Sequence, residues 1–309
     1  MPIIYPDILS EESARREFSY SSRDAILYAL GIGLGEDEGD LPFVYEKDLQ
    51  VVPTAATVLS GTIMPALTPG NGRRKSTLDF AKVVHGEQKT VLHRPLTAGD
   101  ALFTQTRTIG AYDKGPERGA IIVTETRWSD KGDRDVATLT NTFFARGDGG
   151  FGGPASLEAS QYSPPDRAPD HSIKISTRKD QALLYRLSGD SNPLHADPEA
   201  ARLAGFPGPI LHGLCTYGIT CRAILQAVVD NDASRIFSHQ VRFSAPVYPG
   251  ETLRIDLWVE GDAVQFEAVA LDRNVTVIRS GRTVLRNPQR GADDQSNGSQ
   301  SRVSAVAAG

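Results

Sequence analysis

The feature that most constrains this chain is an internal duplication. Residues 28–33 read YALGIG and residues 185–190 read YRLSGD, and each segment is followed by a Pro-x-x-x-Gly-acid motif, at 95–100 and at 246–251. The motif begins 67 residues after the start of the first segment and 61 residues after the start of the second, a difference that one loop can absorb. A repeat of about 150 residues predicts two halves built on the same plan.

Each half shows the same order of patterns. Helical patterns cover 22–30 and 54–59 in the first half, and 177–187 and 212–229 in the second. The run 212–229 is apolar nearly all round, so we expect a buried helix there. Period-two alternation then predicts strands at 80–85, 88–93, 101–111, 119–128 and 135–146, and at 171–176, 236–244, 252–260, 263–271 and 274–285.

This order predicts an α+β double hot-dog fold, in which each half wraps an antiparallel sheet round a central helix, with a long buried helix in each copy. The Gly-rich segment 147–154 interrupts the strand pattern and begins the best candidate linker. The expected divisions are a lead-in over 1–17, an N-terminal repeat over 18–146, a linker over 147–170, a C-terminal repeat over 171–288 and a disordered tail over 289–309.

Charge and hydropathy exclude several classes of protein. The net charge is -5 and the longest basic run is the triplet 73–75, which argues against a nucleic-acid binder. The apolar runs fall short of the ~18 residues that a membrane span needs, and the first residues do not resemble a secretory signal. Cys215 and Cys221 lie too far apart on one predicted helix to form a disulfide, so we expect free thiols and a reducing compartment.

The densest group of proton-carrying side chains lies in the turn that follows residue 188. Asp190, Asn192 and His195 fall within six residues, and Pro193 stiffens the turn that holds them. A carboxylate beside an imidazole can move a proton to and from one bound water, while an amide holds that water by its carbonyl oxygen. The pattern predicts an acid–base site, although a lone Asp or His in such a turn usually only caps a helix or packs.

Gly213 begins the long helix that follows this turn. The first N–H groups of a helix have no partner within it and lie at the positive end of its dipole. A carbonyl oxygen that gains negative charge would be stabilised there, and glycine allows close approach. The alternative is an ordinary helix start in which Gly213 is only a turn residue.

Other kinds of site fit the sequence less well. Asp190, His195, Asp197 and His212 could form a metal site, but their spacing matches no His-Glu-x-x-His or Cys/His pattern. The segment 31–35 has the alternating glycines of a dinucleotide loop but follows a helix instead of a strand. A serine hydrolase is disfavoured because no Gly-x-Ser-x-Gly occurs.

The turn resembles the signature of the MaoC-like, type 2 enoyl-CoA hydratases, which include the hydratase domain of the peroxisomal multifunctional enzyme of β-oxidation. The resemblance covers about residues 18–288. Its most specific part is YRLSGDSNPLHADP at 185–198, supported by RDAILYALG at 23–31, HGEQ at 85–88, HRPL at 93–96 and the motif RFxxPVxPG at 242–250.

The resemblance implies reversible addition of water to trans-2-enoyl-CoA, giving (3R)-3-hydroxyacyl-CoA with no metal or redox cofactor. Asp190 and His195 would form the acid–base pair, Asn192 would help hold the water, and the Gly213 N–H would bind the thioester oxygen. By the same resemblance, the substrate contacts are His85, Gly86, Lys114, Ser191, Pro193, Leu194 and Phe243. The supporting positions are Glu46, Tyr185, Asp197 and His212.

Gly33 occupies the position in the first copy that Asp190 occupies in the second. In the family the degenerate copy makes room for a long acyl chain, and members form homodimers. A hot-dog thioesterase or a non-catalytic acyl-CoA-binding subunit stays open as an alternative. We expect a cytoplasmic protein, because its last three residues are not a peroxisomal SKL address; a peroxisomal location stays open if the source is eukaryotic.

Overall fold

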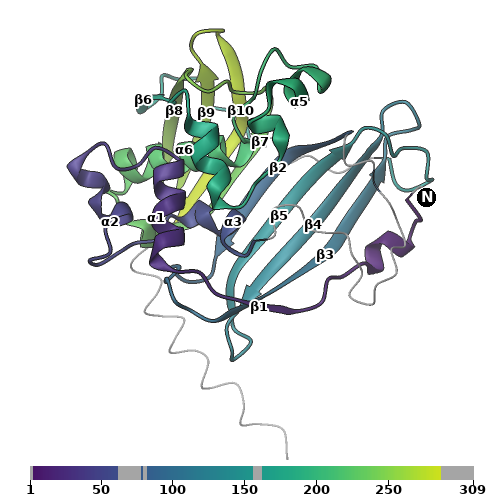
Figure 1. Ribbon diagram of the computed structural model, residues 1–309, viewed down its shortest axis with the longest axis horizontal. Helices are drawn as coiled ribbons and strands as arrows, with labels where there is room; N and C mark the ends of the chain where they lie inside the picture. The colour runs from purple at the N-terminus through teal and green to yellow at the C-terminus, as the bar shows by residue number, and fades with distance from the viewer. Residues whose placement is uncertain (1–2, 62–77, 79–81, 156–161, 287–309) are drawn as a thin grey trace, which may run out of the picture.

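The computed structural model describes residues 3–61, 78, 82–155 and 162–286 (Figure 1). Its α-helices are α1 Ser22–Gly31, α2 Leu41–Val44, α3 Ala56–Leu59, α4 Gln181–Tyr185, α5 Pro198–Leu203 and α6 Gly213–Val228. Its short 3-10 turns are η1 Asp7–Ser10, η2 Glu38–Asp40, η3 Pro53–Ala55, η5 Arg186–Ser188, η6 Pro193–His195 and η7 Ala233–Arg235. Its strands are β1 Arg16–Phe18, β2 Val83–Leu92, β3 Leu102–Asp113, β4 Ala120–Ser129, β5 Asp135–Ala145, β6 His171–Ser176, β7 Ile236–Phe243, β8 Thr252–Glu260, β9 Ala263–Ala270 and β10 Val275–Leu285.

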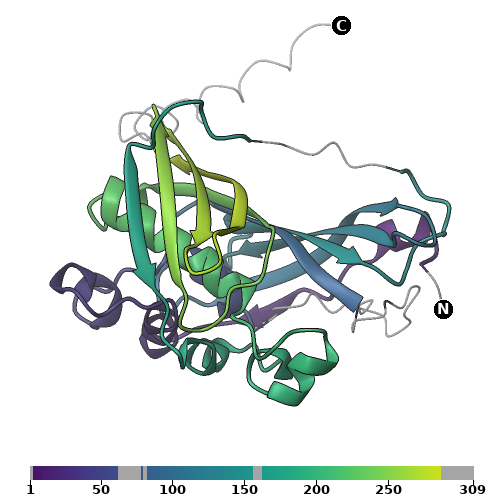
Figure 2. The ribbon, with the colours of Figure 1, turned by 90° about the horizontal axis from the view of Figure 1, so that it is seen from above.

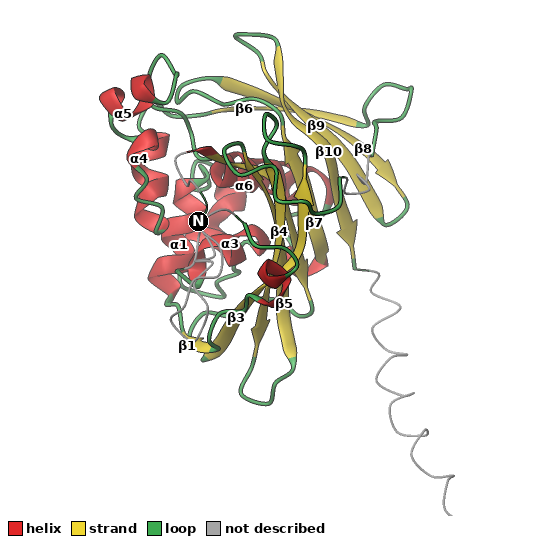
Figure 3. Cartoon of the chain, turned by 90° about the vertical axis from the view of Figure 1, so that its right-hand side faces the viewer, coloured by secondary structure: helices red, strands yellow, loops and turns green. Residues whose placement is uncertain are grey.

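The ten strands form one antiparallel sheet in the order β1-β3-β4-β5-β2-β7-β10-β9-β8-β6. The two repeats join where β2 pairs with β7, with Glu87 opposite Arg242 and Thr90 opposite His239. In Figure 2 the strands of the second repeat stand together at one side and those of the first extend to the other. The helices gather on one face of the sheet (Figure 3). This arrangement confirms the predicted double hot-dog fold.

Helix α6 is the central helix of the second repeat. Every residue from Leu214 to Leu225 is buried, as its all-round apolar sequence predicted. Cys215 and Cys221 lie on it as buried free thiols. Among the described residues, no helix is long and apolar enough to cross a membrane.

Side chains cap the starts of α1 and α5. The Ser21 side chain caps α1 by accepting the Asp24 N–H, and the Asp24 carboxylate accepts the Ser21 N–H in return. Asp197 caps α5 by accepting the Glu199 N–H at 2.8 Å, with Pro198 at the first helical position.

Three predictions need correction. The helix predicted over 177–187 begins later, at Gln181. Residues 80–81 of the strand predicted at 80–85 lie outside the described residues. The rest of that strand and the strand predicted at 88–93 belong to one strand, β2, which spans Val83–Leu92 and has a bulge that shifts its register between His85 and Glu87. In the first repeat α3 spans only four residues, so the long helix predicted for each copy is not found among its described residues.

The predicted lead-in has more structure than expected. It contains η1, whose Ile8 is fully buried, and Glu12 pairs with Arg107 on β3. Strand β1 begins within it and pairs with β3. The predicted tail over 289–309 lies outside the described residues, and the other domain boundaries stay predictions.

Candidate active site

The turn after η5 is built from two successive side chain-to-backbone hydrogen bonds. Gly189 has φ +125, a conformation that favours glycine, and reverses the chain. Asp190 Oδ1 then accepts the Asn192 N–H at 3.1 Å, and Asn192 Oδ1 accepts the Leu194 N–H at 3.0 Å. Short polar side chains commonly hydrogen-bond the backbone two residues ahead, so the sequence itself explains this local fold.

This network changes what Asn192 has available. Its carbonyl oxygen, predicted to hold a water, already accepts one N–H within the turn. An amide oxygen has a second lone pair, and no bond among the described residues uses the Asn192 Nδ2 donors. Asn192 is exposed, so both the lone pair and the donors can reach solvent.

His195 lies at the end of η6 and is only 9% exposed. Its Nδ1 lies 2.8 Å from the Ile210 carbonyl oxygen. Because a carbonyl can only accept, Nδ1 carries the hydrogen and Nε2 keeps a free lone pair. Burial lowers the pKa of His195, against the opposing influence of the Ile210 bond and the Asp190 carboxylate. His195 is therefore a neutral base with Nε2 available.

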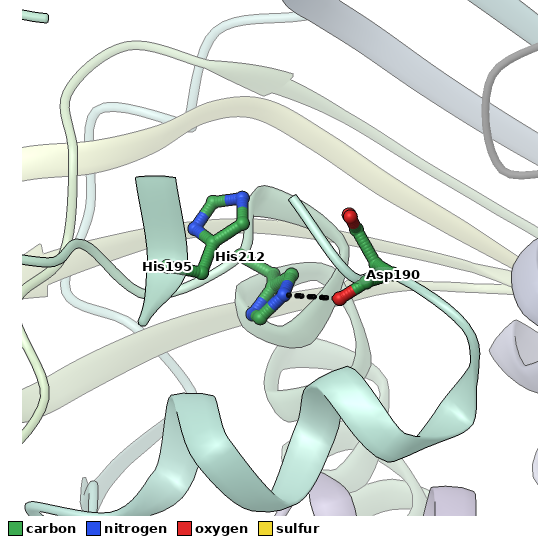
Figure 4. A group of neighbouring side chains, drawn as sticks. All are labelled: Asp190, His195 and His212. Carbon is green, nitrogen blue, oxygen red and sulfur yellow. Dashed lines mark hydrogen bonds between the residues drawn. The ribbon is translucent and has the colours of Figure 1, made fainter. Parts of the chain in front are cut away.

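His212 completes a compact cluster with Asp190 and His195. Its ring stacks on that of His195 at a centroid distance of 3.7 Å, and its Nε2 lies 3.4 Å from the Asp190 carbonyl oxygen (Figure 4). One oxygen of Asp190 and one nitrogen of each ring lie within 4.8 Å of one another. Burial, with the neighbouring His195, lowers the pKa of His212 to about 3, so it stays neutral.

The same three donors are also a possible metal-ligand set, since histidine nitrogens and a carboxylate oxygen suit ions such as Zn²⁺. The sequence spacing had made this the weaker alternative. The bonds that orient Asp190 and His195 serve proton transfer and metal binding equally well.

Gly213 begins α6 directly after His212 and is partly accessible to solvent. The Cys215 and Thr216 N–H groups donate back to the His212 carbonyl, whereas no bond among the described residues uses the Gly213 N–H. A Cβ at Gly213 would lie 3.4 Å from the ring of Phe243. A donor at the positive end of a 16-residue helix thus lies beside a flat apolar wall.

Phe243 connects this helix start to the first repeat. Its ring lies 5.1 Å from that of His85, which lies 5.1 Å from the ring of Phe143. Burial lowers the pKa of His85 to about 4, so it is neutral. The structure therefore brings His85, Phe243 and Gly213 together across the β2–β7 joint.

The other predicted substrate contacts are more spread out. Gly86 lies in the β2 bulge, where a Cβ would come within 2.2 Å of the Phe144 ring, so glycine is needed for packing. Lys114 lies in the β3–β4 turn and donates to the Ala155 carbonyl at 3.1 Å. In the turn after η5, Ser191 and Pro193 are exposed and Leu194 is half-buried.

Of the predicted supporting residues other than His212, one packs against the cluster, one caps a helix and one is exposed. Tyr185 is fully buried, with its ring 4.9 Å from that of His212, so it packs behind the cluster. Asp197 acts as the cap of α5. Glu46 is exposed in the turn after α2, and among the described residues no hydrogen bond or ion pair joins it to the cluster. The orienting role of the Ile210 carbonyl was missed, because a backbone acceptor has no sequence signature.

Comparisons with known proteins identify the family of this chain. The family model described as the MFE-2 hydratase 2 N-terminal domain matches residues 18–147, and the MaoC like domain matches residues 160–280. Enoyl-CoA hydratase ChsH3 of Mycobacterium tuberculosis is 38% identical over 288 residues, covering 91% of this chain and 98% of that protein. Peroxisomal multifunctional enzyme type 2 of Drosophila melanogaster is 38% identical, over 88% of this chain and 46% of the longer enzyme.

Solved structures give the same result. The MaoC-like dehydratase from Phytophthora capsici superimposes with a TM-score of 0.82 at 33% identity, covering 93% of this chain and 99% of that one. A Mycobacterium tuberculosis protein described as having a double hotdog fold superimposes with a TM-score of 0.53 at 14% identity, a likeness of fold alone. The chain therefore belongs to the MaoC-like hydratase 2 family and carries its double hot-dog fold.

Proposed function

We propose that this protein catalyses the reversible hydration of trans-2-enoyl-CoA to (3R)-3-hydroxyacyl-CoA in β-oxidation. The observation that carries the proposal is the convergence of the Asp190 carboxylate and the His195 imidazole beside the free N–H at the start of α6. Relatives named as enoyl-CoA hydratases in Mycobacterium tuberculosis and Arabidopsis thaliana support the same reaction.

In this mechanism one water lies between Asp190 and His195. The Asp190 carboxylate and the Asn192 side chain orient it, and His195 Nε2 accepts one of its protons. The water oxygen forms a bond to C3 of the substrate, while the electrons of the double bond move toward the thioester carbonyl. The protonated His195 then returns its proton to C2, so the elements of one water are added and the enzyme is unchanged.

The negative charge that develops on the thioester oxygen is stabilised by the Gly213 N–H. Such a donor stabilises the transition state by about 3 kcal/mol in well-studied oxyanion holes. The ring of Phe243 beside Gly213 excludes water from that side of the thioester. His85, Gly86 and Lys114 would hold the rest of the CoA ester, with Lys114 near its phosphates.

The direct test is to incubate the purified protein with crotonyl-CoA and longer trans-2-enoyl-CoAs. Loss of the conjugated double bond with a (3R)-3-hydroxyacyl product on chiral chromatography would support the proposal. Release of free CoA thiol with no hydroxyacyl product would identify a thioesterase instead. The rate should be unchanged after exhaustive chelation, and a rate lost on chelation and restored by a divalent cation would assign the Asp190 cluster to a metal.

The assembly and location belong to the same proposal. We propose a homodimer, since the family forms homodimers, and a cytoplasmic or peroxisomal location, since an Arabidopsis thaliana relative is named as peroxisomal. Sedimentation at micromolar concentration tests the first, and a tagged chain in its native cell tests the second.

A further inference from the structure

A row of polar side chains crosses the sheet of the first repeat. Thr108 on β3 lies opposite Thr124 on β4, Thr124 opposite Asn141 on β5, and Asn141 opposite Gln88 on β2. Directly paired residues lie on the same face of a sheet. We call these four residues the polar row.

The polar row lies on the inner face of the sheet, between two apolar clusters. On β4, Thr124 points to the same face as Trp128, and on β5, Asn141 points to the same face as Leu139; Trp128 and Leu139 belong to the main core. Toward the start of β4, Ile122 points to this face too, and it belongs to the small cluster around Ile3 and Ile8. The apolar lining is thus interrupted by the four polar side chains of the row, together with the buried threonines next to them on the same face, Thr90, Thr104, Thr106 and Thr126.

The four residues of the polar row are buried, and three of them carry a polar atom that has no hydrogen-bond partner among the described residues. Their exposures are 1% for Gln88, 3% for Thr108, 0% for Thr124 and 8% for Asn141. Within the described part of the chain, the Thr108 and Thr124 hydroxyls and the Gln88 Oε1 have no hydrogen-bond partner, whereas Gln88 Nε2 donates to the Lys89 carbonyl at 3.0 Å. By contrast, Thr106 and Thr126, one step further along the same strands, bond each other at 2.8 Å. Buried polar groups are nearly always paired, so unpaired ones at one place suggest a ligand.

The polar row begins beside a residue expected to contact the substrate. His85 and Phe143 pair on β2 and β5 just beyond the bulge, separated from the Gln88–Asn141 pair by the Glu87–Thr142 pair. His85 also faces Phe243 beside Gly213. From β2 the row runs away from the catalytic turn to β3, over three strand spacings or about 14 Å. This direction is the one in which an acyl chain bound at Gly213 would extend past His85.

We infer that the polar row binds an uncharged oxygen group, a hydroxyl or a ketone, on the distal part of the substrate's acyl chain. The inference rests on the proposed hydration reaction and defines its substrate class. A plain alkyl chain would leave the Thr108, Thr124 and Gln88 groups unpaired, whereas a hydroxyl or ketone oxygen gives them a donor or an acceptor. The row contains no cation, so a carboxylate there would be buried without a counter-charge.

The selectivity should be substantial. A pocket built to hydrogen-bond a substrate oxygen discriminates strongly against the analogue that lacks it, because the protein's own polar groups are then left unpaired. We expect kcat/KM to be at least tenfold higher for a trans-2-decenoyl-CoA with a hydroxyl near its distal end than for trans-2-decenoyl-CoA. Crotonyl-CoA is too short to reach the row and reports the chemical step alone.

The test measures the ratio of kcat/KM for these two ten-carbon substrates in the wild type and in Thr108→Val and Thr124→Val, which replace a hydroxyl by a methyl group of similar size. Each variant should lower the ratio at least threefold. The matched control is Thr140→Val, whose side chain alternates with Asn141 onto the opposite face of β5, and which should leave the ratio unchanged.

Two outcomes separate this inference from the reaction itself. A wild type that hydrates crotonyl-CoA but prefers unsubstituted decenoyl-CoA overturns the polar-row inference and leaves the hydratase proposal intact. A wild type that hydrates none of the three substrates overturns both. Because the wild-type ratio alone can contradict the inference, the test does not depend on either variant folding.

Discussion

The duplicated turns at Gly33 and Asp190 have opposite fates in the same fold. In the second repeat the turn presents Asp190 and His195 beside the free end of α6. In the first repeat the Gly33 carbonyl accepts a hydrogen bond from the Arg222 guanidinium, which comes from the central helix of the other repeat. A Cβ at Gly33 would lie 2.8 Å from Arg222 Nη1, so an acid like Asp190 does not fit there while Arg222 is in place.

Arg222 is held in place by a buried acid. Asp40 is 0% exposed and lies 3.9 Å from the Arg222 guanidinium. Its two oxygens also accept the Gln226 side chain at 2.9 Å and the Gly35 N–H at 2.8 Å. The first turn has therefore become a structural joint between the repeats, whereas the second keeps groups that can reach a ligand. The first copy lacks the acid at this position, and its turn instead bonds to the central helix of the second copy.

The largest expected effect is on kcat, and it comes from changes in the second turn. His195→Gln should lower kcat about 10³-fold, since a positioned acid or base contributes roughly 10²–10⁴-fold. Asp190→Asn should lower kcat by a similar factor, because His195 can deprotonate only a water that the Asp190 carboxylate holds in place. KM should change little, because neither side chain is needed to hold the CoA. Steady-state kinetics with crotonyl-CoA measure both quantities.

The matched control is Asp180→Asn. Asp180 lies ten residues before Asp190 and is an exposed acid that pairs with Arg178, so this variant should keep full activity. Circular dichroism must show that all three variants are folded. Normal kcat in both catalytic-turn variants would show that the Asp190 cluster is not the catalytic centre.

The grouping of side chains in the second turn could be predicted from sequence, because Asp190, Asn192 and His195 lie within six residues and their turn is built from local hydrogen bonds. The structural role of the first turn could not. Arg222 and Gly33 are 189 residues apart, and only the completed fold brings them together. The same limit hid the polar row, whose members look like ordinary alternating strand residues until the register of four strands places them side by side.

Short elements were also beyond local patterns. Strand β1 has three residues, too few to show alternation, and is held by pairing with β3. The β2 bulge depends on Gly86 fitting under the Phe144 ring, a contact between strands. By contrast, β6, β8 and α6 were predicted within a residue, because each has a long, regular pattern ended by turn residues.

The next effect concerns stability. Arg222→Met leaves the buried Asp40 carboxylate without its counter-charge and should lower the free energy of unfolding by about 3–5 kcal/mol. Denaturant titration at neutral pH measures the change. Activity per folded molecule should stay near that of the wild type, because the pair lies at the first turn.

A second variant distinguishes loss of the charge pair from loss of packing. Adding Asp40→Leu to Arg222→Met removes both charges and should recover part of the lost stability. If the single variant were as stable as the wild type, the first turn would not be the joint that its geometry indicates.

Acid should destabilise the second repeat in particular. His239 is 1% exposed in the core of this repeat, and burial lowers its pKa to about 3, as it does for His212. The unfolded chain binds these protons near pH 6.5 and the folded chain does not, so stability is complete above that pH and is lost as the pH falls toward 3. At pH 5 the loss is about 2 kcal/mol per histidine.

Urea titrations at pH 7.5 and pH 5 measure this loss. His239→Gln should reduce the difference between the free energies of unfolding at the two pH values by about the contribution of one histidine. His93→Gln, which changes an exposed histidine, should leave that difference unchanged. Equal pH dependence in His239→Gln and the wild type would assign the acid sensitivity elsewhere.

The smallest effect compares two glycines on the same helix. Gly213→Ala adds a methyl group at ordinary contact distance, 3.4 Å from the Phe243 ring, so the fold should tolerate it. The methyl narrows the space between the start of α6 and the Phe243 ring, where the thioester is proposed to bind, so kcat/KM should fall about tenfold, or 1.4 kcal/mol. At Gly218 a Cβ would lie 2.5 Å from the Ile32 side chain, so Gly218→Ala should cost about 1–3 kcal/mol of stability. Its activity per folded molecule should remain. Gly213→Ala should therefore change kcat/KM and Gly218→Ala the melting temperature, so both are measured for each variant. An unaltered kcat/KM in Gly213→Ala would show that the start of α6 takes no part in the mechanism.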